Sequence, residues 1–105
     1  MYPPIHYRLP TWIADEIGDP DRRYVTVEDR MALAIRLSAR NIAEGGGPFG
    51  AAVFEIESGK LVAPGVNQVV PLHASVAHAE AIAIMVAQTV CETHDLGASG
   101  LPPME

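Results

Sequence analysis

The chain has 105 residues, which suits one small domain, and 49% of them are hydrophobic, a composition typical of globular rather than disordered chains. Thirteen acidic residues against seven basic ones give a formal net charge of −6. Because contacts to phosphates dominate nucleic-acid binding and the chain offers no basic stripe, we expect no nucleic-acid partner.

Residues 1–25 are predicted to form an irregular N-terminal arm. They carry four prolines and no sustained hydrophobic period, and a short helix is expected around Trp12 to Ile17. Trp12 and Tyr7 are predicted to anchor the arm by packing. No charged head followed by an apolar run opens the arm, so the sequence predicts no signal peptide.

A helix is predicted to begin at Thr26, where Thr26 and Asp29 resemble a capping box. Its expected core-facing stripe recurs at steps of three and four residues: Met31, Ile35, Ala39 and Ile42. A polar stripe runs beside it: Arg36, Arg40 and Glu44. The helix is predicted to end at the glycine run 45–47, because glycine suits a C-terminal cap.

The next segment is predicted to be a hairpin, with a first strand at Ala51 to Ile56, a tight turn at Ser58-Gly59 and a return from Lys60 to Val70. Both faces of the first strand are apolar, so helices are expected above and below the sheet. Pro64 indicates an edge position or a bulge. Since stable sheets usually need three or more strands, further strands are expected outside these residues.

The last predicted helix runs from His78 to about Thr93, and residues 94–105 are expected to form a loop. Every residue from Ala81 to Ala87 is apolar, so this helix is predicted to be buried on more than one side. The apolar run is too short to span a bilayer, and no membrane partner is expected. The single cysteine, Cys91, is predicted to be a buried structural residue, and its lack of a disulfide partner favours a reducing cytoplasm.

A His-Ala-Glu triplet stands at the mouth of this helix. Chance alone would produce about 0.3 His-x-Glu triplets in a chain with four histidines and eight glutamates, so the spacing by itself is a weak signal. Residues two apart on a helix point to nearly opposite sides, and His78 and Glu80 can converge only by reaching over the helix end. That placement suits one metal ligand and one acid–base group.

The order of the motifs adds specificity. A helix, then "GGGPFGAAVF", then "GVNQVV", then "AHAEAIAI" resembles the cytidine/deoxycytidylate deaminase superfamily and, within it, the bacterial guanine deaminases. The resemblance covers about residues 26–105. It implies a three-layer α/β/α sandwich around a mixed sheet, with residues 1–25 as an arm and residues 26–105 as the N-terminal part of the deaminase-like domain.

The resemblance also implies roles for five residues. His78 would be a zinc ligand and Glu80 the proton shuttle in hydrolytic deamination of a nucleobase, with guanine giving xanthine and ammonia. Asn67 would hydrogen-bond the purine, Phe49 would wall the pocket, and the backbone of Ala79 would touch the base. For Phe49 a purely core role is an equal alternative.

The sequence departs from the family at the metal site. A catalytic zinc normally takes three protein ligands, and the family supplies two of them from a Pro-Cys-x-x-Cys motif that these residues lack. The other histidines match no ligand spacing and are expected on the surface or in loops: His6, His73 and His94. We therefore expect a companion segment with the two cysteines and no activity from the 105 residues alone. The resemblance to guanine deaminases also implies a homodimer that can share segments.

Three alternatives accompany this interpretation. A cytosine- or adenine-type deaminase would use the same scaffold. The tRNA-editing relatives are disfavoured, because this part of the chain lacks a basic surface. From another class, the chain could be a non-catalytic binding or assembly module that completes its sheet with a second polypeptide.

Overall fold

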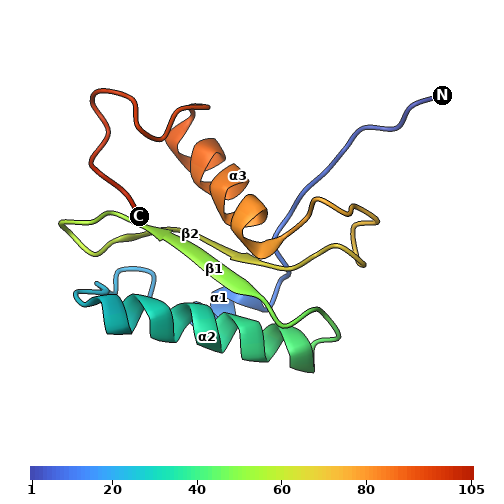
Figure 1. Cartoon of the computed structure of the whole chain (residues 1–105), viewed down its shortest axis with the longest axis horizontal. Helices are drawn as coiled ribbons and strands as arrows, with labels where there is room; N and C mark the ends of the chain where they lie inside the picture. The colour runs from blue at the N-terminus through green and yellow to red at the C-terminus, as the bar shows by residue number, and fades with distance from the viewer.

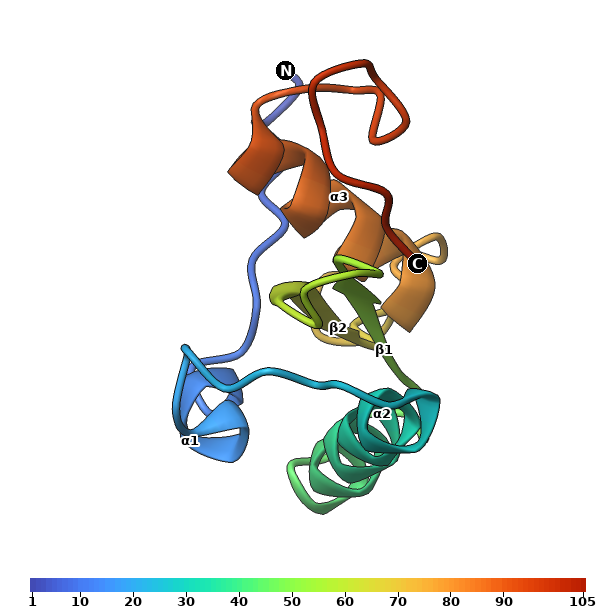
Figure 2. The ribbon, with the colours of Figure 1, turned by 90° about the vertical axis from the view of Figure 1, so that its left-hand side faces the viewer.

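The computed structural model describes residues 1–105 as a layered α/β fold (Figure 1). The elements in chain order are α1 (Ile13–Ile17), α2 (Val27–Ala43), β1 (Gly50–Phe54), β2 (Leu61–Val66) and α3 (Ala79–Cys91). Figure 2 shows α3 on one face of the hairpin, with α2 and α1 side by side on the other. This arrangement confirms the predicted cover on both faces of the sheet. None of the helices has the length and apolarity that crossing a membrane requires.

The two strands form an antiparallel pair whose register runs from Gly50 opposite Val66 to Phe54 opposite Leu61. Pro64 lies opposite Ala52 in regular register on a strand with a free edge, which agrees with the predicted edge position. The ladder is irregular between Val53 and Phe54 instead, so no bulge lies at Pro64.

The predicted strand limits need correction. Residues 56–59 form a wider loop than the expected two-residue turn, because the Gly59 N–H donates to the Glu55 carbonyl at 3.0 Å. The return strand ends at Val66 rather than Val70: the Asn67 N–H still donates to Phe49, next to β1, but the Gln68 N–H donates to Ala77, outside the hairpin.

The two faces of the hairpin pack in separate clusters. Phe54 and Val66 face α2 and join Leu33 and Leu37, while Val53 faces α3. The alternation along β1 is therefore the predicted one. At its ends the pattern fades, because Phe49 and Ile56 are exposed. α3 turns a continuous line into the sheet (Ala79, Ile82, Ala83 and Ala87), whereas Ile84 and Val90 lie on its exposed surface.

The predicted core stripe of α2 is wrong. The buried line is instead Arg30, Leu33, Leu37 and Asn41, and the apolar residues of the predicted stripe are exposed. The physical reason is that two polar residues, Arg30 and Asn41, lie in the buried line and satisfy their hydrogen bonds there. The apolar period in the sequence therefore marks the neighbouring, exposed face of α2 instead of its buried face.

The predicted polar stripe of α2 faces α1 rather than open solvent. Arg40 pairs with Asp15 at 3.2 Å and with Glu44 at 3.1 Å, and its guanidinium lies 5.4 Å from the centroid of the Trp12 ring. The hydrogen bonds that Arg40 donates to the carboxylates of Glu44 and then Asp15 raise the pKa of Arg40 above its usual value. Trp12 thus anchors the arm, as predicted.

The residues after α3 return to the free edge of β1 (Figure 1). Met104 forms an antiparallel bridge with Glu55, and the Phe54 N–H donates to the Glu105 carbonyl at 2.7 Å. Arg30 fixes this position, since it donates to the Ile56 carbonyl at 2.9 Å and pairs with the Glu105 carboxylate. The expected loop therefore closes with a single β-bridge rung on the free edge of β1.

Replacing Gly65 by Ala is expected to destabilise the fold by about 1–3 kcal/mol, because β2 and α3 approach too closely there for a side chain. A Cβ at Gly65 would clash with the Ala79 carbonyl and lie 2.6 Å from the Ala83 nitrogen, both backbone atoms. Chemical denaturation measures the change in the free energy of unfolding. Gly97→Ala is the matched control, since the nearest atom to its Cβ would lie at 3.4 Å; equal effects of the two variants would contradict the prediction.

Candidate functional site

The His-Ala-Glu triplet lies at the start of α3, as the sequence predicts. His78 is the N-cap residue, with an extended backbone and no hydrogen bond from its side chain to the helix. Glu80 is in the first turn, and the His78 Nδ1 and Glu80 Oε1 atoms are 3.4 Å apart. Their side chains are 58% and 68% exposed, so both are accessible to a ligand from outside the chain. The two groups do converge over the helix end.

Asn67 and Phe49 meet at the end of the hairpin that is remote from its loop. The Asn67 N–H donates to the Phe49 carbonyl at 3.3 Å, and the Asn67 Oδ1 accepts from the Val69 N–H at 3.2 Å. Phe49 is 58% exposed, so it does not fill the core of the described chain. The structure therefore favours a surface position over the alternative core role.

A backbone hydrogen bond links the Asn67–Phe49 pair to the His78–Glu80 pair. The Gln68 N–H donates to the Ala77 carbonyl at 2.9 Å, and so the residue after Asn67 is tied to the residue before His78. Ala79 is 1% exposed, and its carbonyl lies against Gly65 of β2. The end of the hairpin and the start of α3 thus hold the five predicted residues in one region.

The residues of the chain do not complete a metal site by themselves. No group of three His, Cys, Asp or Glu side chains is placed to hold a metal ion. His78 can offer one ligand, because its imidazole is accessible and the Glu80 carboxylate lies on its Nδ1 side. The remaining histidines are exposed and scattered, as expected: His6, His73 and His94. Cys91 is partly exposed at the far end of α3, which corrects its predicted burial.

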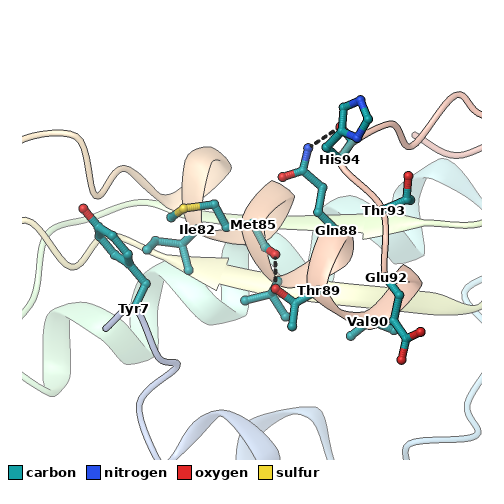
Figure 3. Close-up of a pocket in the computed structure, with 10 residues that line it drawn as sticks. Tyr7, Ile82, Met85, Gln88, Thr89, Val90, Glu92, Thr93 and His94 are labelled. Carbon is teal, nitrogen blue, oxygen red and sulfur yellow. Dashed lines mark hydrogen bonds between the residues drawn. The ribbon is translucent and has the colours of Figure 1, made fainter. Parts of the chain in front are cut away.

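A hollow of about 690 Å³ lies elsewhere, along α3. Figure 3 shows residues that line it, among them Tyr7, Met85 and His94. Neither His78 nor Glu80 lines it, so its size does not make it the site of the predicted chemistry.

A smaller hollow of about 390 Å³ lies between the arm and the end of the hairpin, and Asn41 and Asn67 both line it. Sequence reasoning overlooked Asn41, which is 4% exposed and bonds to the carbonyls of Gly47 and Asn67. The available signal was its spacing, four residues after Leu37, which is itself four residues after Leu33.

Solved structures resemble the chain, while no protein-family model and no curated protein matches it. A guanine deaminase from Nitrosomonas europaea is 44% identical with a TM-score of 0.89, over 99% of this chain and 57% of its own. The protein NE0047 in complex with 2,6-diaminopurine is 46% identical with a TM-score of 0.87, over 94% and 52%. A guanine deaminase from Bacillus subtilis is 33% identical with a TM-score of 0.64, over 68% and 45%.

The chain therefore spans about half the length of the solved relatives it matches. The similarity to the Nitrosomonas enzyme covers the hairpin, both packed helices and the His78–Glu80 region, since 99% of the chain is included. The chain resembles these guanine deaminases and matches the N-terminal portion of their fold.

Proposed function

We propose that the chain forms part of a zinc-dependent guanine deaminase, which hydrolyses guanine to xanthine and ammonia. The observation that carries this proposal is the His78–Glu80 pair, 3.4 Å apart at an accessible helix entrance, in a chain 44% identical to a guanine deaminase. The relative NE0047 was solved with 8-azaguanine and with 2,6-diaminopurine, two purine analogues that share the shape of guanine.

In this proposal Glu80 moves the proton. Its carboxylate accepts a proton from the attacking water and delivers it to a ring nitrogen of guanine, while the new C–O bond forms at the amine-bearing carbon. As the tetrahedral intermediate collapses, Glu80 takes the proton of the new hydroxyl group and passes it to the amine; the C–N bond breaks and the amine leaves as ammonia. Asn67 hydrogen-bonds the purine, Phe49 walls the pocket, and the backbone of Ala79 contacts the base.

His78 is proposed to be one ligand of a zinc ion, which, when bound, activates water for attack. The two remaining ligands are proposed to come from a Pro-Cys-x-x-Cys segment outside these 105 residues. The division of the chain at residue 25, the mixed sheet of the completed domain and a cytoplasmic location remain predictions.

Two exposed features support a companion segment. Beyond the rung at Met104, the free edge of β1 has no strand beside it, and unpaired strand edges readily accept another strand. Beside that edge, α2 carries a row of large apolar side chains that are more than half exposed: Val27, Met31, Ile35 and Ile42. The row lies on the side of α2 away from α1. Arg36 and Arg40, on the side toward α1, form ion pairs with Glu16 and Asp15 of α1. A strand–helix unit from the same chain or from a second copy would cover both features.

The first test is a denaturing intact mass of the purified protein, followed by an assay of ammonia release from a panel of nucleobases. We expect a longer chain or a second polypeptide that carries Pro-Cys-x-x-Cys, bound zinc, and ammonia from guanine. If only cytosine or only adenine released ammonia, that base rather than guanine would be the substrate. No ammonia from any base, with zinc bound, would overturn the proposed reaction.

The second candidate function is a non-catalytic assembly module. The observation that favours it is that the chain by itself places no three ligating side chains together. A single 11.2 kDa species without zinc and without a companion polypeptide would support this candidate over the enzyme.

A further inference from the structure

Asn41 is a buried amide at the end of α2, where it meets the glycine run and the end of β2. Its exposed fraction is 4%, and few polar side chains of the chain are as deeply placed. Buried amides are costly unless they are hydrogen-bonded, and asparagine is a weak helix former, so Asn41 adds little to the last turn of α2. The position therefore calls for a reason other than the stability of α2.

Both hydrogen bonds of the Asn41 amide go to backbone carbonyls outside the helix. Its Nδ2 group donates to the Gly47 carbonyl at 2.9 Å and to the Asn67 carbonyl at 3.0 Å. The Asn41 backbone carbonyl also accepts from the Gly46 N–H at 2.7 Å. One residue thus fixes the glycine run and the end of β2 relative to each other.

Close packing leaves this network little room. A Cβ at Gly46 would lie 2.5 Å from the Asn41 Nδ2, so the glycine is required for the amide to sit where it does. A Cβ at Gly47 would lie 3.2 Å from the Asn67 Cγ, so the Asn67 side chain rests on the glycine run that Asn41 holds. A displacement of Asn41 must therefore move the support of Asn67.

Hydrogen bonds hold both the side chain and the backbone of Asn67. The side-chain Oδ1 accepts from the Val69 N–H at 3.2 Å. The backbone carbonyl accepts from the Asn41 Nδ2, and the backbone N–H donates to the Phe49 carbonyl. With Oδ1 engaged, the Nδ2 group of Asn67 is left to donate to a ligand. We infer that Asn41 is a positioning residue, which sets the aim of the Asn67 amide and the placement of Phe49 toward the base; this inference rests on the proposed function.

The test is a double-mutant cycle on the zinc-loaded protein together with its companion segment, with guanine as the substrate. Asn41→Ala is expected to raise KM about tenfold, the effect of losing one well-placed hydrogen bond to the base, with little change in kcat and zinc content. Asn67→Ala is expected to raise KM at least as much. The double variant is expected to have the same KM as Asn67→Ala, because a misoriented Asn67 side chain contributes no more to binding the base than a missing one.

Arg40→Ala is the matched control. It lies beside Asn41 on α2 and also loses two hydrogen bonds, but these go to Asp15 and Glu44 rather than to the glycine run. It is expected to leave KM unchanged in both backgrounds. Full additivity of Asn41→Ala and Asn67→Ala, or an equal rise in KM for Arg40→Ala, would overturn the positioning role.

A second measurement separates this inference from the proposed function. The side-chain amide NMR signals of Asn67, identified by their loss in Asn67→Ala, are expected to shift in Asn41→Ala and to stay in place in Arg40→Ala. Unmoved signals would overturn the inference whatever the substrate. If the signals shift in a protein that does not deaminate guanine, the positioning of Asn67 by Asn41 stands, and only the proposed guanine deaminase activity is rejected.

Discussion

Replacing Glu80 by Gln is expected to lower kcat for guanine by about 10²–10⁴-fold, the usual contribution of a positioned acid–base group. Glutamine keeps the length of the side chain and a polar atom near the His78 Nδ1, which lies 3.4 Å from the Glu80 carboxylate. It cannot accept a proton from water and return it to the base. Steady-state kinetics with ammonia detection measure the loss, and metal analysis is expected to find zinc unchanged.

The matched control is Glu92→Gln at the opposite end of α3, where the glutamate is exposed and far from His78 in the sequence. This variant is expected to keep the wild-type kcat. Normal turnover by Glu80→Gln would remove the proton-transfer role from Glu80. A parallel loss of zinc in that variant would instead make Glu80 part of the metal site.

The hairpin and α3 could be predicted from the sequence because their signals are local. Alternating apolar residues on β1 indicated two covered faces, and Ala51 and Val53 do face α3 while Ala52 and Phe54 face α2. The Thr26 cap was equally local, since its hydroxyl accepts from the Asp29 N–H at 3.1 Å. Strand ends were less predictable, because they depend on where the next amide finds an acceptor.

The orientation of α2 could not be predicted because its buried face is decided by distant partners. Arg30 is buried by bonding the carbonyls of Tyr24 and Ile56 and the carboxylate of Glu105, which lies 75 residues away. No period along the helix contains that information. Three residues of the predicted core stripe, Met31, Ile35 and Ile42, instead belong to the exposed apolar row, which supports a further segment that covers this surface.

The candidate site likewise contains residues that local sequence predicts and residues that depend on distant contacts. His78 and Glu80 belong to one turn of α3, so their spacing and the neighbouring motifs were enough to predict that they converge. Asn67 and Phe49 came from resemblance, and the hydrogen bond between their backbones depends on hairpin register. The spacing of Asn41 after Leu37 can indicate that it is buried, but its bonds to Gly47 and Asn67 arise only when three separated segments meet.

Replacing His78 by Ala is expected to abolish both zinc retention and deamination. Even the outer partners of a metal ligand change affinity by about 10–100-fold, so removal of a ligand itself should weaken zinc binding by about a hundredfold or more. The imidazole is accessible and makes no capping hydrogen bond with α3, so its loss leaves the helix start otherwise intact. Zinc content after dialysis against a chelator, together with circular dichroism, separates metal loss from unfolding.

His94→Ala is the matched control, since His94 is another exposed histidine, beyond the far end of α3. It is expected to retain zinc and activity. Together with Glu80→Gln the two histidine variants assign the roles: loss of turnover with zinc retained belongs to the proton shuttle, and loss of both belongs to the ligand. Zinc retained by His78→Ala would show that the metal is held elsewhere, and the helix entrance would then no longer be the metal centre.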